Sequence, residues 1–366
     1  MARRFSSLEE MGLNLINNNF WKNKKIFLTG NTGFKGSWMT MFLNHLGAEI
    51  YGFSLAPHTK PSLFDVLNLD KIAHSKQGDI NNYSELKNSM VEADPEIIIH
   101  MAAQPLVRKS YTYPLETFNT NIVGTANVLD AARSCKSVKA ILNITTDKCY
   151  ENNEDGRTFK ETDALGGHDP YSNSKACSEL VTDSYRKSYF ENVSVGIATA
   201  RAGNVIGGGD WSEDRLIPDV IRQIYEGHKL KIRNPNAIRP WQHVFEPILG
   251  YLILIEKLYE NCKEHSTSYN FGPEETNVLT VKQILDLAKK SLNQVDYEID
   301  QNNDMHEAKL LMLDIKKAKQ KLSWKPKMSM DKTLFSTLSW YSSYYESKAI
   351  FDYSKEAVEE FINGEN

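Results

Sequence analysis

The chain has 366 residues, 41% of them hydrophobic and 25% charged, which is enough to bury a full-size core and argues against a disordered chain. Its net charge of −4 at pH 7 creates no broad basic surface, so nucleic acid and anionic membranes are poor candidates for a primary partner. The cysteines Cys135, Cys149, Cys177 and Cys262 form no CxxC pair, which argues against a metal site or a disulfide framework and favours the reducing cytoplasm.

Targeting and membrane segments are not expected. Residues 1–21 carry charges and amides where a secretory signal needs an unbroken apolar run, and we interpret them as an N-terminal extension. The most apolar later stretch, residues 248–258, is far shorter than a membrane span and includes Glu256 and Lys257. We predict that this stretch is a packed helix.

Short apolar runs alternate with longer segments through residues 22–205. The longer segments have room for crossover helices, and this rhythm is typical of βαβ units that build a parallel sheet covered on both faces. Residues 114–135 have helical apolar spacing, and residues 170–190 begin with a proline at a first-turn position. Strands are predicted at residues 24–29, 49–55, 96–101, 139–146 and 193–199.

The rhythm loosens after residue 205. Helices are predicted near residues 217–227, 246–260 and 280–291, with a short strand at the sequence KLKIR. We interpret residues 206–345 as mainly a smaller, substrate-binding lobe. It is interleaved with the first lobe, because no low-complexity linker separates the two. Residues 346–366 are predicted to be a C-terminal tail.

A glycine-rich turn follows the first predicted strand directly. Glycines allow a tight turn and a close approach to a pyrophosphate, and the first N–H groups of the next helix stabilise its charge. Such a turn alone is weak evidence, but its place after the first strand of a doubly wound pattern makes it strong. The fold class is therefore α/β, a Rossmann-type doubly wound parallel sheet with a smaller, interleaved C-terminal substrate-binding lobe. The predicted cofactor-binding turn consists of Gly30, Asn31, Thr32, Gly33, Phe34, Lys35 and Gly36.

Further cofactor contacts are expected where later strands end. The acidic residue that usually grips the adenosine ribose is replaced by Ser54, so this signal does not separate NAD from NADP. Asp79 and Ile80 are placed to bracket the adenine, although an aspartate ending a strand is as often a turn former. The small residues Ala102 and Ala103 leave room for a flat ring, or serve only for packing. The expected contacts are Ser54, Asp79, Ile80, Ala102, Ala103 and Gln104.

The sequence Tyr-Ser-Asn-Ser-Lys contains the pair that decides the chemistry. Tyr171 and Lys175 are four residues apart on a predicted helix, so both side chains lie on one face. There a lysine ammonium lowers the pKa of the phenol, which takes a hydroxyl proton while hydride leaves the same carbon. An arbitrary Tyr-x-x-x-Lys pair usually lies on a solvent-exposed helix face and has no catalytic role. The preceding strand, however, ends in Thr146, Asp147 and Lys148, a hydroxyl, a carboxylate and an amine at the mouth of the same crevice.

These motifs together resemble a known family. TGNTGFKGSW, HMAAQPLVRKSY, TTDKCYEN, GGHDPYSNSK, TARAGNVIGGGDW, DRLIPD and RPWQHVFEP closely resemble the CDP-glucose 4,6-dehydratase family of the extended short-chain dehydrogenases/reductases. The later LDIKKAKQKLSWKPKMS resembles the closing segment of that superfamily. The resemblance covers roughly residues 22–345, and TTDKCYEN and RPWQHV are its most specific parts.

The resemblance implies an NAD-dependent lyase that returns its hydride within each turnover. It implies that Tyr171 is the base at the sugar 4-hydroxyl, tuned and oriented by Lys175 and Thr146. Asp147 is then the acid that protonates the departing 6-hydroxyl. Lys148 stands where related deoxythymidine-sugar dehydratases carry the glutamate that removes the C5 proton. A lysine needs a depressed pKa for that task, and its alternative role is an electrostatic partner of Asp147.

The chain departs from the family pattern at two positions. The family usually has a histidine where this chain has Asn31, in the cofactor turn, so the change bears on cofactor affinity. It usually has a serine where this chain has Thr146, which keeps the hydroxyl and therefore the chemistry.

Arginines and amides are the expected contacts of the nucleotide-sugar substrate, because a guanidinium matches phosphate in a bidentate fork. Any single arginine is otherwise usually surface charge. An amide at Asn121 is expected to orient the Tyr–Lys pair through water, or to serve as a cap or lie on the surface. By the family pattern, Asn204, Arg215 and Arg239 contact the sugar diphosphate, Arg233 lies near the base, and Gln104 and Arg108 reach the sugar from the other wall.

Two other functions compete with the dehydratase. A sugar-nucleotide 4-epimerase needs the tyrosine, the lysine and a hydroxyl but no acid–base pair for water loss, so Asp147 and Lys148 favour the dehydratase. A non-catalytic NAD(P)-binding regulator has no need of both Tyr171 and Lys175. The residues alone do not decide the nucleotide base. The resemblance also implies a homodimer, formed through the helices at 114–135 and 170–190.

Overall fold

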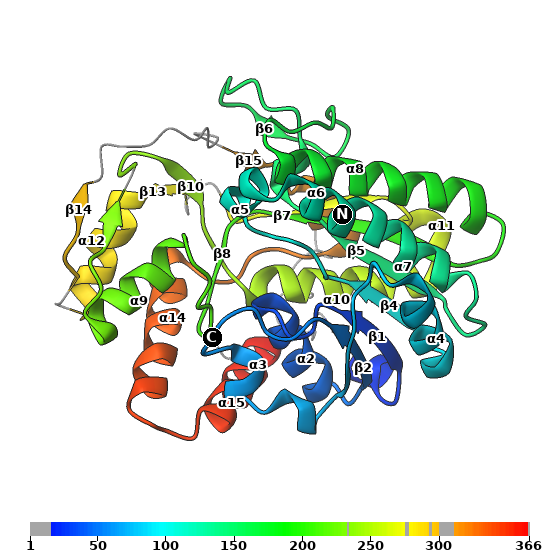
Figure 1. The fold of residues 1–366 in the computed structure, drawn as a ribbon, viewed down its shortest axis with the longest axis horizontal. Coiled ribbons are helices and arrows are strands. Elements are labelled where there is room, and N and C mark those ends of the chain that lie inside the picture. The colour runs from blue at the N-terminus through cyan, green and yellow to red at the C-terminus, as the bar shows by residue number, and fades with distance from the viewer. Residues whose placement is uncertain (1–15, 233, 275–277, 293–294, 300–310, 365–366) are drawn as a thin grey trace, which may run out of the picture.

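The computed structural model describes residues 16–232, 234–274, 278–292, 295–299 and 311–364. Its centre is a seven-stranded sheet in the order β12-β7-β5-β4-β1-β2-β3, in which every neighbouring pair is parallel (Figure 1). The predicted doubly wound α/β fold is confirmed. The strands are β1 (Lys25–Thr29), β2 (Glu49–Ser54), β3 (His74–Gln77), β4 (Ile97–His100), β5 (Ala140–Ile144), β7 (Gly196–Ala202) and β12 (Ser268–Phe271).

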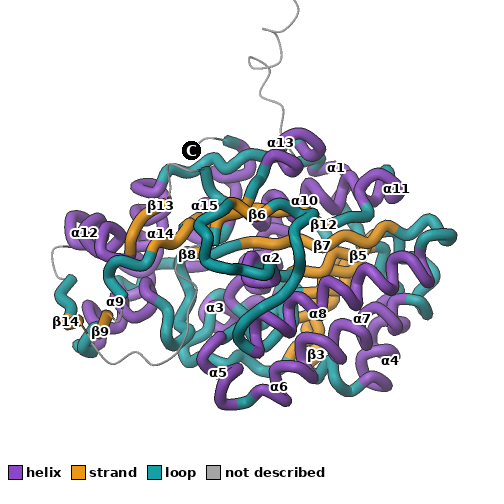
Figure 2. The backbone as a smooth tube through the Cα atoms, turned by 90° about the horizontal axis from the view of Figure 1, so that it is seen from above, coloured by secondary structure: helices purple, strands orange, loops and turns teal. Residues whose placement is uncertain are grey.

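Helices cover both faces of this sheet. Helices α2 (Phe34–His45) and α10 (Phe245–Glu260) pack on one face, and α4 (Tyr83–Ala93), α7 (Gly124–Ala132) and α8 (Pro170–Tyr185) pack on the other (Figure 2). β4 and β5 are buried along their whole length because both of their faces are covered.

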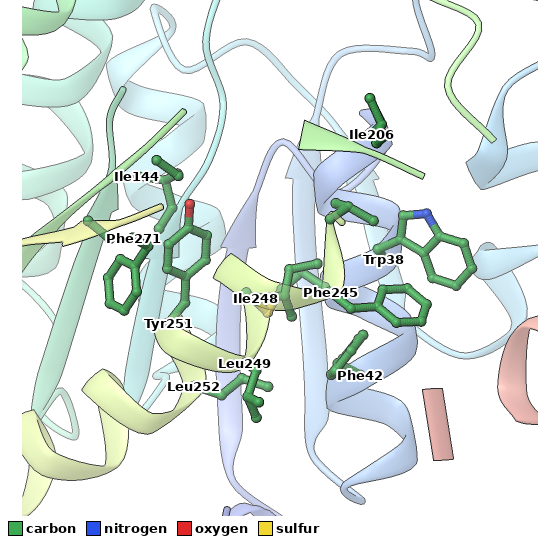
Figure 3. Close-up of a cluster of buried hydrophobic side chains, with 14 of the residues drawn as sticks. Trp38, Phe42, Ile144, Ile206, Phe245, Ile248, Leu249, Tyr251, Leu252 and Phe271 are labelled. Carbon is green, nitrogen blue, oxygen red and sulfur yellow. The ribbon is translucent and has the colours of Figure 1, made fainter. Parts of the chain in front are cut away.

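Alternate side chains of the strands enter two separate cores. Phe27 and Ile98 belong to the core under α4 and α7, whereas Ile26 belongs to the larger core on the other face. Figure 3 shows part of the larger core, where Phe42 of α2 lies beside Phe245 of α10. The sheet is therefore anchored on both sides, and its strand ends form a rigid edge.

The two long predicted helices are present, each interrupted by a π turn. Residues 114–135 form α6 (Pro114–Phe118), a π-helical turn at Asn119–Val123 and α7. Helix α8 runs into a second π turn at Arg186–Phe190. Shorter helices in this half are α1 (Asn18–Trp21), α3 (Leu63–Val66), η1 (Leu69–Lys71), α5 (Val107–Thr112) and η3 (Asp147–Cys149).

Residues 206–345, which we propose form mainly a second lobe, contain helices of up to 16 residues and strands of only two to four residues. Helix α10 and strand β12 come from residues 206–345 but complete the main sheet layer, while β6 (Thr158–Phe159) pairs with β15 (Met312–Leu313) across the lobes. The remaining elements are α9 (Leu216–Glu226), α11 (Cys262–His265), α12 (Val281–Leu292), α13 (Lys316–Leu322), α14 (Met330–Tyr345), β8 (Val205–Ile206), β9 (Lys231–Ile232), β10 (Ile238–Pro240), β11 (Gln242–His243), β13 (Val278–Thr280) and β14 (Glu298–Ile299).

The segments outside the two lobes are packed where the structure describes them. The buried Trp21 of α1 donates its indole N–H to Glu256 of α10 at 2.6 Å. The predicted tail, residues 346–366, differs from expectation. It contains helix α15 (Ile350–Asn363), whose Phe361 lies against Phe42 of α2 with ring centroids 6.3 Å apart. An apolar stripe on α15 explains this packing. Within the described ranges, no helix is both long and apolar enough to cross a membrane.

Candidate active site

A cavity of about 1740 Å³ opens at the carboxyl ends of the parallel strands, between the sheet and the second lobe. In open parallel sheets this edge is the general ligand site, at the point where the strand order reverses. Here the reversal lies between β1 and β4. Among the residues that the structure describes, no cluster of three or more His, Cys, Asp or Glu side chains is arranged to hold a metal ion.

The glycine turn has the shape that a pyrophosphate needs. Gly30 has a φ of +77°, and a Cβ added to it would lie 2.7 Å from the Ala102 nitrogen, so only glycine fits. Gly33 caps the start of α2 without a side chain, which leaves the first N–H groups of that helix facing the cavity. Thr32, Gly33, Phe34, Lys35 and Gly36 all line the cavity, as predicted for the turn.

Asn31 is the exception in this turn. Its side chain is fully buried and donates to the Ser75 hydroxyl on β3 at 2.9 Å, behind the turn and outside the cavity lining. The side chain of Asn31 therefore holds the turn against β3, and its role toward a cofactor stays a prediction. Gly52 of β2 makes the room, because a Cβ there would collide with the amide. The Asn31 side-chain oxygen has no hydrogen-bond partner among the described residues.

The ends of β2 and β3 supply Ser54, Asp79 and Ile80 to the cavity wall, where an adenosine was expected. Asp79 also forms the turn that the sequence left as its alternative, since its carboxylate accepts from the Asn81 N–H at 2.9 Å. Thr32 donates to the Leu55 carbonyl at 2.9 Å and so fixes the strand end against the glycine turn.

The loop after β4 is held in place by side-chain amides. Gln104 lines the cavity together with Ala102 and Ala103, but its amide donates to Thr117 at 2.9 Å and its oxygen accepts from the Leu106 N–H at 2.7 Å. Its side chain therefore supports the loop. Asn121 lies outside the cavity lining and donates to Ser174 of α8 at 2.8 Å, so it orients that helix through a direct bond.

Tyr171 and Lys175 lie on the first two turns of α8, and both line the cavity. Burial raises the pKa of Tyr171 to about 12, against the lowering effects of a hydrogen bond with Thr146 and of the Arg215 cation. Lys175 donates to the Ile144 carbonyl at 3.2 Å, and burial lowers its pKa to about 8 while Glu179 opposes this shift. Arg215 thus acts to lower the pKa of Tyr171, and the same effect expected of Lys175 stays a prediction.

Asp147 and Lys148 lie beside this pair, in the short helix η3 that follows β5. Asp147 is only 1% exposed, and its Oδ1 accepts from the Thr146 hydroxyl at 2.9 Å. The Lys148 ammonium lies 3.6 Å from the same oxygen, the contact expected of an electrostatic partner. All three side chains line the cavity, so the arrangement fits the acid–base role as well.

Four of the predicted substrate residues also line the cavity: Arg108 of α5, and Asn204, Arg215 and Arg239 from the second half of the chain. Arg215 is paired with the buried Asp210 at 2.7 Å. Arg108 lies 3.6 Å from Asp214, with both side chains partly exposed. Arg233, predicted near the base, lies outside the described residues.

An aromatic cluster supports the Arg215 wall from behind. The Tyr341 hydroxyl donates to the Asp210 carbonyl at 2.5 Å, and the indole of Trp38 donates to the Gly208 carbonyl at 2.9 Å. A Cβ on Gly208 would collide with the Trp340 ring, so the glycine lets helix α14 reach the loop. Helices α2 and α14 thereby fix the loop that carries Asp210.

Sequence reasoning missed two features of the site. His58 lines the cavity with its Nε2 3.4 Å from the Ser212 hydroxyl, and burial lowers its pKa. A buried ion pair, Glu179 with Arg201 at 2.8 Å, lies beneath the Tyr–Lys helix. Glu179 follows Lys175 by four residues on the same helix, and that spacing was the available signal.

Comparison with known proteins places this arrangement in a family. The model of the family described as GDP-mannose 4,6 dehydratase matches residues 27–337. The chain belongs to this family. CDP-glucose 4,6-dehydratase of Salmonella typhimurium is 42% identical over 95% of this chain and 99% of its own length, so the resemblance read from the motifs is confirmed. dTDP-glucose 4,6-dehydratase 1 of Escherichia coli is 27% identical over 87% of this chain and 93% of its own.

Solved structures share the fold at lower sequence identity. UDP-glucose 4-epimerase of Thermotoga maritima, with UDP-glucose, aligns with a TM-score of 0.77 and 22% identity, over 87% of this chain and 99% of that one. A dTDP-glucose 4,6-dehydratase from Streptomyces venezuelae, with NAD bound, aligns with a TM-score of 0.74 and 22% identity, over 88% of this chain and 98% of that one.

Proposed function

We propose that this chain is an NAD-dependent nucleotide-sugar 4,6-dehydratase that converts CDP-glucose to CDP-4-keto-6-deoxyglucose and water. The observation that carries the proposal is the acid–base pair Asp147 and Lys148, which lies in one cavity with Thr146, Tyr171 and Lys175. The name of the 42% identical relative supports cytidine diphosphate as the nucleotide.

The residues around the glycine turn fit NAD. Gly30 and Gly33 leave the backbone open to a pyrophosphate, and Ser54, Asp79 and Ile80 are placed to hold the adenosine. Ala102 and Ala103 leave room for a flat ring beside Tyr171. When bound, NAD takes a hydride from the sugar and gives it back in the same turnover. Lys35 and Lys175, whose pKa values burial lowers to about 8, line the same part of the cavity.

Tyr171 is the proposed base at the sugar 4-hydroxyl. The phenolate needs a pKa well below 12 to exist near neutral pH, and the Thr146 hydrogen bond and the Arg215 cation both act in that direction. The Thr146 hydroxyl also bonds Asp147, and its single proton serves one of the two partners at a time. One hydroxyl therefore lies between the proposed base for C4 and the proposed acid for C6.

Asp147 and Lys148 are the proposed pair for loss of water. Once C4 carries a carbonyl, the C5 proton is acidic, and Lys148 takes it as the C6–oxygen bond breaks. The departing hydroxyl leaves as water with a proton from Asp147, and C5 regains a proton when hydride reaches C6. The alternative for Lys148 is to hold Asp147 in place through the 3.6 Å contact.

The second wall is the proposed diphosphate site. Asn204, Arg215 and Arg239 supply the donors there, and Arg108 supplies another from the sugar side. Asp210 orients Arg215 by the 2.7 Å ion pair, which leaves the remaining guanidinium N–H groups for phosphate oxygens.

Mass spectrometry of products tests this proposal against a panel of CDP-, UDP-, dTDP- and GDP-glucose. A dehydratase gives a product lighter by one water, with catalytic NAD and no net change in its oxidation state. The UDP-glucose 4-epimerase of Thermotoga maritima shares this fold, so a 4-epimerase is the second candidate, and it would give an isomer of equal mass. A non-catalytic binding protein gives no product. An isomer as the main product would overturn the dehydratase assignment.

A homodimer in the cytoplasm completes the proposal. On the outer faces of the two long helices, Leu115 is 77% exposed, Val123 49% and Leu180 58%, whereas Ala176 of α8 faces the core. Burying such residues against a second copy gives a symmetric four-helix contact. Four free cysteines are compatible with a reducing compartment. Light scattering at micromolar concentration tests the dimer, and a monomer there would refute it.

A further inference from the structure

A buried carboxylate joins the Tyr–Lys helix to the strand that carries the acid–base pair. Oε1 of Glu179, on α8, accepts from the Thr145 hydroxyl at 2.5 Å and from Arg201 Nε at 2.9 Å. Its Oε2 accepts from the Thr199 hydroxyl at 2.7 Å and from Arg201 Nη2 at 2.8 Å. These four side chains are nearly or fully buried.

The two ends of the Thr145–Glu179 bond lie next to the reacting groups. Glu179 is one helical turn beyond Lys175 and two turns beyond Tyr171 on the same helix. Thr145 immediately precedes Thr146, the residue whose hydroxyl bonds both Tyr171 and Asp147. A change in the length of the Thr145–Glu179 bond therefore changes the distance from the Tyr171 phenol to the Thr146 hydroxyl that orients it.

Arg201 holds the carboxylate from the other side. Its guanidinium also donates to the Tyr150 hydroxyl at 2.8 Å and lies over the ring of Tyr150. Tyr150 in turn donates to Asn270 of β12 at 2.7 Å. The carboxylate is thus tied to three strands of the sheet, and it is a fixed point against which the end of β5 is set.

We propose that Thr145 and Glu179 are positioning residues, whose hydrogen bond sets the spacing between the Tyr171–Lys175 helix and the Thr146–Asp147–Lys148 strand end. The inference rests on the proposed function for its kinetic meaning. Glu179 does not line the cavity, and Thr145, which does, donates its hydroxyl to Glu179, so each acts through its neighbours.

Thr199 offers a matched control for Thr145. Both threonines are buried and donate to the same carboxylate, Thr145 from directly after β5 and Thr199 from the adjacent strand β7. Thr199 lies within β7, however, and does not adjoin the acid–base segment. Removing its hydroxyl leaves Oε2 bonded to Arg201, so the carboxylate stays in place. A purely structural role of this cluster predicts equal effects at the two positions.

The experiment compares Thr145→Val, Thr145→Ser and Thr199→Val in the full chain, with CDP-glucose as the substrate. We expect Thr145→Val to lower kcat roughly ten- to a hundredfold with little change in KM, the scale of a small misplacement of reacting groups. Thr145→Ser keeps the hydroxyl and restores most of kcat. Thr199→Val should lower the thermal stability about as much as Thr145→Val does, but it should keep kcat within about twofold of the wild type.

Hydrogen exchange gives a readout that does not depend on activity. In the free protein, Thr145→Val is expected to speed exchange in a peptide covering residues 145–151, and Thr199→Val is not. Equal effects of the two valine variants on both kcat and exchange would overturn the inference. If the wild type dehydrates no nucleotide-glucose, the proposed function fails, and the exchange comparison alone decides whether Thr145 positions the segment.

Discussion

The two walls of the cavity are built differently. On the sheet side, Tyr171 and Lys175 stand on a helix whose buried face is tied to β5 by a network of buried hydrogen bonds. On the second-lobe side, Arg215 is held by Asp210, and Asp214 pairs with Arg108 of α5, with both of these last side chains partly exposed. The first wall is set before a ligand arrives, while Arg215 on the second wall keeps N–H groups that its aspartate does not use and that a ligand can bond.

This difference assigns separate tasks to the walls. Preorganised groups in a buried setting are what charge development in a reaction needs, because little reorganisation remains at the moment of reaction. An arginine held by one carboxylate suits the recognition of a diphosphate, because its remaining N–H groups can bond the phosphate oxygens. Changes on the sheet side should therefore alter kcat, and changes on the lobe side should alter KM.

The largest effect is expected from Tyr171→Phe. Loss of the phenol removes the proton acceptor at C4, so kcat should fall by roughly 10²- to 10⁴-fold, the range of positioned acid–base catalysis. Tyr251→Phe is the matched control, because Tyr251 is a buried phenol close to Tyr171 that does not line the cavity. Steady-state kinetics should find the control within a few-fold of the wild type. If Tyr171→Phe were as active as the wild type, another residue would be the base at the sugar 4-hydroxyl.

Asp147→Asn and Lys148→Met should separate water loss from the first oxidation. Both variants should bind substrate almost normally yet release water about a hundredfold more slowly. Single-turnover analysis in deuterated water should find a 4-keto sugar that retains its 6-hydroxyl. Loss of Lys148 should stop deuterium entry at C5, whereas loss of Asp147 permits it. Normal deuterium entry in Lys148→Met would leave Lys148 as only the partner of Asp147, 3.6 Å away.

On the lobe wall, Arg215→Lys should raise KM about tenfold, equivalent to about 1.4 kcal/mol of binding, and leave kcat nearly unchanged. A lysine keeps the charge but loses the fork that reaches both Asp210 and a phosphate. Arg222→Lys is the control, because Arg222 pairs with Asp219 on α9 and does not line the cavity. If kcat falls and KM does not, the division of tasks between the walls is wrong.

The smallest effect concerns stability far from both walls. Burial raises the pKa of Glu256 from 4.5 to about 7, so the folded protein binds a proton that the unfolded chain releases. The stability from this group is present below pH 4.5 and is lost as the pH rises toward 7. Glu256→Gln should flatten this slope, by an amount on the order of 1 kcal/mol across the window.

Denaturant unfolding at several pH values measures this slope. The exposed Glu260→Gln, on the same helix, is the control and should change the slope far less, because the Glu260 charge is only a minor cause of the raised Glu256 pKa. Glu246, whose pKa burial also raises to about 7, should leave part of the slope in the Glu256 variant. If Glu256→Gln had the wild-type slope, the Glu256 carboxyl would not be a source of the pH dependence of the unfolding free energy.

The sequence was most informative where local pattern determines structure. The glycine turn after β1 and the four-residue spacing of Tyr171 and Lys175 are short-range signals, and both places were predicted correctly. The strand runs were found because a parallel sheet buries them on both faces. The motifs also identified the family, which the 42% identical relative confirms.

Long-range partners escaped the sequence for a physical reason. The direction of the Asn31 side chain depends on the room left by Gly52 and on the Ser75 hydroxyl, which lie on two later strands. The amide of Gln104 bonds Leu106 of its own loop and Thr117 of α6, which its position at a strand end did not reveal. The expected tail became α15 because its apolar stripe meets α2, a contact across more than half of the chain.

The contacts between α14 and the Gly208–Asp210 loop affect the order in which parts of the protein fold during synthesis. Chains fold as they are synthesised, from the N-terminus onward. The Rossmann core can form once β12 at residues 268–271 has emerged, but Trp340 and Tyr341, which hold the loop beside Arg215, are made some seventy residues later. A nascent or truncated chain that lacks α14 would thus have the cofactor turn and the Tyr–Lys pair, but the loop beside Arg215 would lack the contacts that hold it.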